Sequence, residues 1–541
     1  MNHLIKHQTN LSVIVVIFFG LLAICFSIFR GNVILDDPFH HGEFFAATVG
    51  LLENDNHSFQ PLTIHGALDF VPALIAQYYW GDNNYFLPTF AIYKALHFLA
   101  AFLLILIAYR LTRSKPYQEL VILAVVAASP LLVGSRDLFL LFSLYLFLQF
   151  NDRDIKSSVG IFLQILFGFT VAFGLFWSYD RGIAGSLSLG IATLVLLYRN
   201  YWYVVSLISF FVTVGILSWA FEVFSIKNYL SSIFSLMELT ESWSFDWNVI
   251  TILITIFTST INFCAVISLI YCDKKYKSLI RNLPLILCLS SLSIFMLKIG
   301  INRADATHIY WTLWMPMLIG LHIYGKEIFT KLVINILYIS ILFVAILLTI
   351  LLKAYGLALV AGIIAFTNLI FKYEKIENYI ILLFGSLVFV CYGVISYNGI
   401  YGIINEKYKW IGYIISPPSN RFSSTEGVVW ASDQLQKHDI NCVFDLSNNG
   451  VINGLTRRPS CSRFTYPIYA SPKREGNLIA DLRNAFPPAI VYSSTYWSYK
   501  IDGRDMKVRF PKLDQFIVEN YTREICHHGY CVRYIQRQDN D

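Results

Sequence analysis

The sequence predicts an α-helical polytopic membrane protein with about 13 transmembrane helices, followed by a small C-terminal α/β domain outside the membrane. Of its 541 residues, 56% are hydrophobic and only 14% are charged, whereas soluble globular proteins carry roughly 25% charged residues. Apolar runs recur over the first 400 residues, and most approach the roughly 20 residues that cross a bilayer. From about residue 421, charged residues, Pro, Gly and Asn become common. We therefore expect a transmembrane domain at 1–400, with a first outer loop at 30–88, and a C-terminal extracytoplasmic domain at 401–541.

Each predicted span is one apolar run. The runs lie at about 11–29, 89–109, 117–134, 138–150, 159–177, 183–198, 203–221, 248–271, 283–299, 308–324, 331–352, 355–371 and 378–397. The first run lacks a convincing small-residue cleavage site, so we expect it to remain as a span. Because the number of runs is odd, the two ends of the transmembrane domain are expected on opposite sides of the membrane.

Basic residues predict the orientation in the bilayer. Counted over alternate loops, Lys and Arg are about twice as frequent in one set as in the other, and the more basic set is expected on the cytoplasmic side. The N-terminus is then cytoplasmic, and the first outer loop and the C-terminal domain are periplasmic or extracellular, with a bacterial inner (plasma) membrane as the favoured location. Because the net charge of +6 is spread over short loops, we expect no nucleic-acid partner.

The acidic and histidine-bearing loops all fall on the predicted outer side, and the first of them is the densest. The ionisable residues within 34–72 are Asp36, Asp37, His40, His41, Glu43, His65 and Asp69. Ionisable groups at the membrane boundary are costly and tend to be retained for function, so this density indicates a reaction site. Two short amphipathic helices, at 43–52 and 67–79, are expected to lie in the interface because of their aromatic residues.

Asp36 and Asp37 are the candidate catalytic residues. A transfer to a hydroxyl acceptor requires a carboxylate that takes the proton as the new bond forms. Two adjacent carboxylates supply one base and a second group that binds a metal or the acceptor. The alternative is that the pair only caps the start of an interfacial helix, where Asp is favoured.

The remaining polar residues of this loop are candidates for phosphate or metal binding. They are His40, His41, Glu43, His65 and Asp69. The H-H-x-E spacing matches no closed zinc site. A divalent cation such as Mg²⁺ or Mn²⁺ prefers carboxylates, which makes Asp37 and Glu43 its candidate ligands. Solvated loop histidines are the alternative.

A later outer loop carries further candidates for binding a phosphate. The stretch INRADATHIYW contains Arg303, Asp305 and His308. An Arg can bind a departing phosphate with two parallel hydrogen bonds, and His308 can add another. An Arg–Asp salt bridge that closes the loop is the alternative.

Adjacent opposite charges mark two more outer helix ends. They are Asp180 with Arg181, in WSYDRGIAG, and Arg136 with Asp137. Asp180 and Arg181 are included among the candidate substrate-binding residues. For both pairs, an ion pair with a structural role is the favoured alternative.

The C-terminal domain is expected to alternate strands and helices. Short buried strands are predicted at 441–446 and 489–492, and helices at 426–438 and 476–485. Four cysteines in this part, Cys442, Cys461, Cys526 and Cys531, can form two disulfides in three ways on the outer side of a membrane. We favour the pairs Cys442–Cys461 and Cys526–Cys531, and four free thiols in a reducing compartment are the alternative.

Several of these features together resemble the GT-C superfamily, whose members include protein O-mannosyltransferases and lipid A aminoarabinose transferases. An N-terminal span is followed by an outer loop with two acidic residues, and Asp36-Asp37 resembles the Asp-Glu pair of these families. His65-Gly66-Ala67-Leu68 stands where many members have His-Pro-Pro-Leu, without the two prolines. The stretches GLTRRPSCSRFTYP, NAFPPAIVYSS and FIVENY are similar to parts of the outer domain of bacterial members.

The resemblance implies an integral-membrane glycosyltransferase that uses a polyprenyl-phosphate sugar and inverts the anomeric carbon. The acceptor would be a glycan, a lipid or a protein on the outer face. Asp36 or Asp37 would be the general base. Arg303 and His308 are matched to the donor phosphate by loop position and chemistry.

Two other classes of function remain open. A polysaccharide polymerase or ligase also works on polyprenyl-linked glycans, but it uses a pyrophosphate carrier and needs no paired acids. A transporter keeps ionisable groups near the middle of the membrane and often shows internal repeats. Here the charges lie at the predicted outer rim, and we detect no repeat.

Overall fold

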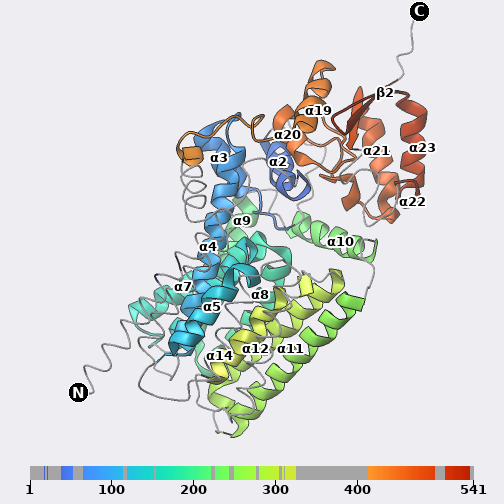
Figure 1. Ribbon diagram of the computed structural model, residues 1–541. Coiled ribbons are helices and arrows are strands. Elements are labelled where there is room, and N and C mark those ends of the chain that lie inside the picture. Colours follow the sequence, from blue (N-terminus) through green and yellow to red (C-terminus); the bar gives the residue numbers. More distant parts are fainter. Residues whose placement is uncertain are drawn as a thin grey trace, which may run out of the picture.

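A computed structural model describes a helical bundle with a smaller mixed domain at one end (Figure 1). The described residues are 18, 21, 38–52, 65–113, 118–151, 154–220, 226–242, 249–275, 279–303, 308–309, 311–324, 412–493 and 506–535. The predicted spans at 331–352, 355–371 and 378–397, and nearly all of 11–29, lie outside them.

Among the described residues, five helical segments are long and apolar enough to cross a membrane. They are α4 (Phe86–Leu111), α7 (Ser158–Trp177), α8 (Tyr179–Arg199), Tyr201–Trp219 and Asn282–Asn302. The fourth combines η2 (Tyr201–Tyr203) with α9 (Val204–Ala220), and the fifth lies within α12 (Leu279–Arg303). The membrane character predicted from composition is thus confirmed, whereas the number of 13 spans is not established.

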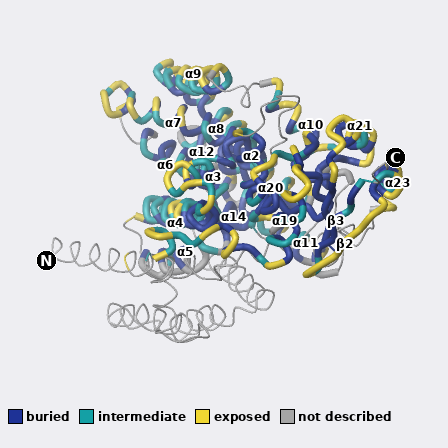
Figure 2. The backbone as a smooth tube through the Cα atoms, turned by 90° about the horizontal axis from the view of Figure 1, so that it is seen from above, coloured by how far each residue is buried: buried dark blue, intermediate teal, exposed yellow. Residues whose placement is uncertain are grey.

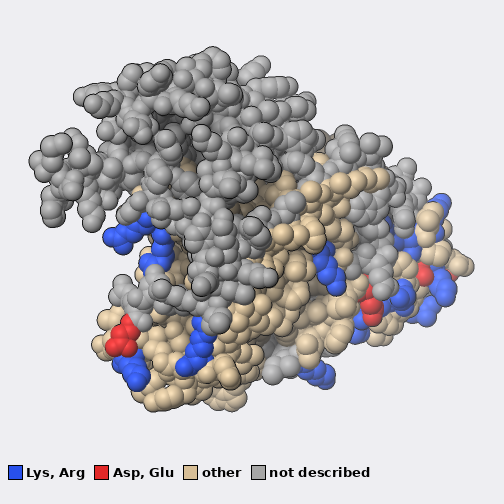
Figure 3. All heavy atoms as spheres, turned by 90° about the horizontal axis from the view of Figure 1, so that it is seen from below, with Lys and Arg blue, Asp and Glu red and all other residues tan. Residues whose placement is uncertain are grey.

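The remaining helices of the bundle are shorter or less apolar. They are α5 (Gln118–Leu132), α6 (Leu138–Asn151), α11 (Val249–Lys275) and α14 (Trp314–Tyr324). Each overlaps a predicted apolar run, and η1 (Ser135–Asp137) links α5 to α6. On the face of the molecule seen in Figure 3, the Lys and Arg side chains of the described part are scattered over the surface.

Helices of the bundle approach closely where one of them carries a small residue. A Cβ on Gly168 of α7 would lie 2.3 Å from the carbonyl oxygen of Ser206 on α9, and a Cβ on Gly182 of α8 would lie 2.2 Å from that of Gly174 on α7. Such close packing is the main attraction between helices in lipid, which is as apolar as their side chains. α9 also exposes Phe211 and Trp219, as expected for a helix at the lipid-facing side of the bundle (Figure 2).

The first outer loop contains two helices, as predicted, with shifted bounds. α2 spans Pro38–Leu52 and so begins before the predicted 43–52, because Pro38 is well suited to the first position of a helix. Residues 67–70 form a turn, and α3 follows at Val71–Trp80. Tyr78 and Tyr79 at the end of α3 are exposed, which suits the interfacial position expected of them.

One outer helix was not predicted. α10 (Ile226–Ser242) lies between α9 and α11 along the chain and runs beside the C-terminal domain (Figure 1). It buries Tyr229, Ser232 and Ser235 and exposes Leu230, Phe234 and Met237. Its serines and charges interrupt the apolar pattern, so only contact with the rest of the protein marks its buried face.

The C-terminal domain contains a three-stranded sheet in the order β1-β3-β2, with both pairings antiparallel. The strands are β1 (Ala489–Ser493), β2 (Arg523–His527) and β3 (Tyr530–Tyr534). The turn between β2 and β3 has positive φ at His528 (48°) and Gly529 (78°), the pattern of a tight type I′ hairpin.

Helices accompany this sheet in the described part of the domain. They are α19 (Glu426–Lys437), α20 (Gly450–Thr456), α21 (Glu475–Ala485), α22 (Met506–Arg509) and α23 (Pro511–Asn520). The predictions of β1, α19 and α21 are confirmed. The predicted strand at 441–446 is wrong, because this segment joins its neighbours only through isolated parallel bridges, Val443 with Ser460 and Asp445 with Val491.

Two disulfides connect parts of the C-terminal domain. Cys442 is bonded to Cys461, and Cys526 is bonded to Cys531 across the β2–β3 hairpin. This is the pairing that we favour from the sequence. Cys288, in α12, is a buried free thiol.

The C-terminal domain docks on the first outer loop through α20 and α2. A Cβ on Gly42 would lie 2.5 Å from the backbone nitrogen of Gly450, and a Cβ on Gly450 would lie 2.1 Å from the carbonyl oxygen of Gly42. Beside this contact, Phe45 of α2 stacks on Phe86 of α4 with ring centroids 4.0 Å apart, and both rings share a buried cluster with Val451 of α20. The chain is buried where α2 and α20 meet (Figure 2).

We expect Gly450→Ala to destabilise the protein by about 2 kcal/mol, because the added methyl group must displace backbone atoms of α2 and overpacking typically costs about 1–3 kcal/mol. The unfolding midpoint in detergent should fall. The matched control is Gly476→Ala in α21, where a Cβ meets nothing within 4 Å and where Ala favours the helix. Equal midpoints for Gly450→Ala and wild type would show that this contact does not hold the domain.

Candidate functional site

A buried cluster around Glu43 joins three segments that are far apart in the sequence. His65 Nε2 lies 2.5 Å from Glu43 Oε2, and the hydroxyl of Tyr469, from the C-terminal domain, donates to Glu43 Oε1. The neighbouring Tyr466 hydroxyl donates to the carbonyl oxygen of Phe39 at 3.0 Å and accepts from the backbone N–H of Gly450 at 2.9 Å. The first outer loop is therefore held by polar contacts as well as by the close approach of α2 and α20.

Glu43 is ionised at neutral pH although it is buried. Burial acts to raise the pKa of its carboxyl, but the charge of His65 and the hydrogen bonds from His65 and Tyr469 together hold that pKa below its usual value. A buried carboxylate is tolerated only when it is paired in this way. Both oxygens of Glu43 are therefore engaged by protein groups.

The turn at 65–70 sits against the junction between α7 and α8. The backbone N–H of Tyr179 donates to the carbonyl oxygen of His65 at 2.7 Å, and that of Leu68 donates to Phe176 at 2.9 Å. A Cβ on Gly66 would lie 2.1 Å from the carbonyl oxygen of Trp177. This close approach excludes a side chain at position 66 and explains why proline is absent there.

Asp69 extends the cluster toward the helix bundle. Its carboxylate accepts a hydrogen bond at 3.2 Å from the hydroxyl of Tyr93 on α4. Burial raises the pKa of the Asp69 carboxyl above its usual value, against the opposing charges of His65 and Arg136. Arg136 also interacts electrostatically with Asp180, so its charge acts on both groups.

Arg181 joins the outer ends of two helices. Its guanidinium pairs with Asp180, and its Nε lies 3.4 Å from Oδ1 of Asp137 on η1. Asp180 accepts a further hydrogen bond at 2.6 Å from Ser178, and Asp137 accepts one at 2.9 Å from the backbone N–H of Gly134. The two adjacent-charge pairs seen in the sequence are thus interlocked.

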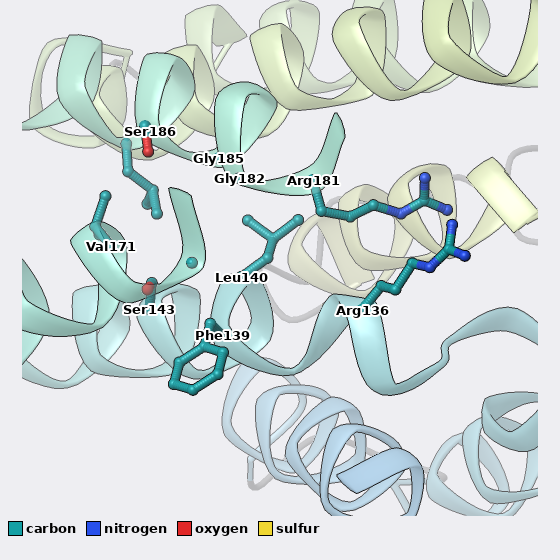
Figure 4. Close-up of a pocket in the computed structure, with 11 residues that line it drawn as sticks. Arg136, Phe139, Leu140, Ser143, Val171, Arg181, Gly182, Gly185 and Ser186 are labelled. Atoms are coloured by element: carbon teal, nitrogen blue, oxygen red, sulfur yellow. The ribbon is translucent and has the colours of Figure 1, made fainter. Parts of the chain in front are cut away.

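A small cleft lies beside these arginines between α6, α7 and α8, with a cavity volume of about 10 Å³. Arg136 and Arg181 extend in the same direction at one end of it (Figure 4). Its walls are apolar, at Phe139, Leu140 and Val171, and its lining includes the small residues Gly185 and Ser186. The cleft therefore has two arginines at one end and a lining of apolar and small polar residues.

The other predicted site residues are placed as follows. Asp36, Asp37 and Asp305 lie outside the described residues, and so does the side chain of Arg303 at the end of α12. His40 is exposed on α2. His41 packs on Phe90 with ring centroids 4.6 Å apart, and His308 packs on Trp311 with centroids 4.9 Å apart. Of the predicted residues, the structure thus gathers Glu43, His65 and Asp69 into one cluster, and Asp180 and Arg181 into a second that Arg136 links to the first.

The described residues place limits on a metal site. A cation at Glu43 would share the carboxylate with His65 and Tyr469, each of which already meets one of its oxygens. Glu524, Cys526 and Cys531 lie within ligand spacing of one another, but the two cysteines are joined in a disulfide and offer no thiolate. Asp37, the other candidate ligand, lies outside the described residues.

Tyr469 and Tyr93 are site residues that the sequence analysis missed. Tyr469 is 426 positions from Glu43, and Tyr93 lies inside an apolar run that reads as an ordinary span. A tyrosine in such places gives no local signal of its partner. Only the docked C-terminal domain reveals that Tyr469 faces Glu43.

The solved structures that resemble this chain are membrane glycosyltransferases of the GT-C superfamily. ArnT from Cupriavidus metallidurans in the apo state matches with a TM-score of 0.52 and 10% identity, over 97% of this chain and 98% of ArnT. The same protein bound to undecaprenyl phosphate matches with a TM-score of 0.50 and 11% identity, over 98% and 99%. This chain therefore has the ArnT fold along nearly its whole length.

A further solved structure also resembles this chain. The oligosaccharyltransferase AglB from Archaeoglobus fulgidus, in complex with an inhibitory peptide and a dolichol-phosphate, matches with a TM-score of 0.45 and 11% identity, over 98% of this chain and 75% of AglB. No protein-family model matches the sequence, and no curated protein matches it.

We expect the Glu43 cluster to make stability depend on pH on the acid side only. The folded-state pKa of Glu43 lies below its unfolded-state value of about 4.5, so its contribution is present above pH 4.5 and is lost as pH falls through the folded-state pKa. Glu43→Gln should lower the unfolding midpoint at pH 7, because breaking a buried pair costs about 3 kcal/mol or more. The variant should also lose less stability than wild type as the pH falls below 4.5.

The matched control for this prediction is Asp433→Asn. It breaks the Arg421–Asp433 pair, which is largely exposed and is therefore expected to contribute little. Unfolding midpoints in detergent, measured across pH 3–8, separate the two variants. An acid-side slope that is identical in Glu43→Gln and wild type would contradict the assignment.

Proposed function

We propose that this chain is an integral-membrane glycosyltransferase of GT-C type. It moves a sugar from a polyprenyl-phosphate carrier to a glycan, lipid or protein acceptor at the outer face of a bacterial inner membrane. The observation that carries the proposal is a set of buried and half-buried ionisable groups, from Glu43 to Arg181, beside a bundle of apolar helices with the ArnT fold. Buried charges of this kind are costly and are retained where they serve a function.

The cleft beside Arg136 and Arg181 supports a polyprenyl-phosphate donor. Guanidinium groups bind phosphate oxygens with paired, charge-assisted hydrogen bonds, and the apolar side chains of Phe139, Leu140 and Val171 lie beside them. ArnT, which has the same fold, was solved with undecaprenyl phosphate bound. In our proposal the phosphate lies at the arginines, and the polyprenyl chain leaves along the apolar walls into the bilayer.

The chemistry assigned to Asp36 and Asp37 follows from their place in the chain. They directly precede Pro38, the first residue of α2, and α2 is held by Glu43 and Gly42. One of the two carboxylates takes the proton of the acceptor hydroxyl as its oxygen bonds to the anomeric carbon. The bond from that carbon to the phosphate oxygen breaks on the opposite face, its electron pair leaves with the phosphate, and the configuration is inverted.

The remaining polar groups would bind the donor. Stabilising the charge that develops on the leaving phosphate is usually a large part of catalysis. We assign this role to Arg181 with Arg136. The other donor-binding candidates are His40, His41, Glu43, His65, Asp69, Asp180, Arg303, Asp305 and His308. Residues 1–400 form the catalytic domain in this proposal, and 401–541 form an outer domain that holds the first loop.

We expect Asp36→Asn and Asp37→Asn, tested separately, to leave folding intact and at least one of them to abolish transfer. Loss of a general base lowers a rate by about 10²–10⁴-fold. The measurement is release of polyprenyl phosphate from a sugar-loaded carrier, with unfolding midpoints as the folding control. Asp433→Asn, an exposed residue of the outer domain, should keep full activity.

Full transfer activity in both Asp36→Asn and Asp37→Asn would refute the assigned base. Turnover only of a pyrophosphate-linked carrier would instead identify a polymerase or ligase.

A further inference from the structure

One short segment of the C-terminal domain contacts two of the outer helices, α2 and α10. In this segment, Tyr466 and Tyr469 contact α2 through Phe39 and Glu43. Five residues later, the Arg474 guanidinium donates to Glu238 of α10 at 2.7 Å and to Ser235 at 2.8 Å. Residues 466–474 therefore bridge the first outer loop and the loop between α9 and α11.

Aromatic neighbours pack around the ring of Tyr469, in addition to the hydrogen bond between its hydroxyl and Glu43. Tyr469 is 1% exposed and stacks on Tyr466 with ring centroids 5.3 Å apart and an interplanar angle of 16°. Phe39 packs against the same ring, with centroids 6.1 Å apart. The phenol oxygen thus has one position, set by the C-terminal domain.

The two oxygens of Glu43 have different partners. Tyr469 holds Oε1 from the side of the C-terminal domain, and His65 meets Oε2 from the side of the bundle. A carboxylate held at both oxygens has a fixed plane, so it fixes the ring of the histidine it binds. His65 is in turn anchored through its carbonyl oxygen to the start of α8.

We propose that Tyr469 is a positioning residue for the transfer reaction, acting through Glu43 to hold the imidazole of His65 in one orientation. This role rests on the proposed function. It assigns to the outer domain a direct part in the geometry of the membrane-embedded site.

Several titratable groups face Glu43 and must be included in its pH dependence. They are His40 on α2, His65 and Asp69 on the turn, Tyr93 on α4 and Tyr469 on the outer domain. Of these, only Tyr469 and His65 form hydrogen bonds that lower the pKa of Glu43. Removing the tyrosine hydroxyl should therefore move the protonation of Glu43 to higher pH.

The test is Tyr469→Phe, which keeps the ring and removes one hydroxyl. We expect kcat to fall roughly 10–100-fold, the range seen when a supporting residue is removed, and the acid limb of the pH–rate profile to move to higher pH. The matched control is Tyr492→Phe, because the Tyr492 hydroxyl also donates to a carboxylate, that of Glu524, within the same domain. This control should keep the wild-type kcat and pH profile.

A double-mutant cycle shows whether Tyr469 acts through Glu43. We expect the Glu43→Gln/Tyr469→Phe variant to be no slower than Glu43→Gln alone, since residues that act as a unit are not additive. If the wild type is active, two results would overturn this role of Tyr469 and leave the proposed function standing. One is a Tyr469→Phe variant with the wild-type kcat and pH profile. The other is a double variant in which the losses of the two single variants multiply. A wild type without transfer activity would overturn the proposed function and, with it, this role.

Discussion

The structure depends on the contact between Gly42 and Gly450, where two backbones meet with no room for a side chain. α2 lies in the first outer loop and α20 lies about 400 residues later, in the C-terminal domain. Their close approach brings Tyr469 onto Glu43 and places Val451 in the cluster that holds Phe45 and Phe86. A helix of 15 residues between two loops has little stability alone, so its position is set by the domain that covers it. The outer domain is therefore a structural part of the site.

The charges of the site are arranged so that none is buried alone. Glu43 meets His65, Asp69 lies within the field of His65 and Arg136, and Arg181 is shared by Asp137 and Asp180. A site assembled before the substrate arrives needs no reorganisation when charge develops in the transition state, which is the basis of electrostatic catalysis. The same pairing holds the ends of α6 and α8 together, so the structural and functional interpretations of Arg181 are compatible.

The sequence predicted what local patterns can encode. Composition identified the membrane class, apolar length identified α4, α7, α8, α9 and α12, and the density of polar groups identified Glu43, His65 and Asp69. The bounds of α2 and the helix α10 were missed, because their buried faces are defined by long-range contacts. α2 meets the outer domain, whereas Tyr229 of α10 packs on Phe176 and Tyr179 of the bundle. β2 was also missed, since it is exposed throughout and shows no alternation. Tyr469 could not be found, because a long-range hydrogen bond leaves no spacing pattern.

The central claim is that this set of ionisable groups forms one site, which receives the carrier phosphate at its arginine end. The most direct test is an experimental structure of the protein in lipid nanodiscs with undecaprenyl phosphate. We predict a phosphate within about 3 Å, a hydrogen-bond distance, of the Arg136 or Arg181 guanidinium, with the polyprenyl chain along the apolar walls of the cleft. An ordered carrier phosphate bound elsewhere on the protein, with both guanidiniums in contact only with protein groups, would contradict the account.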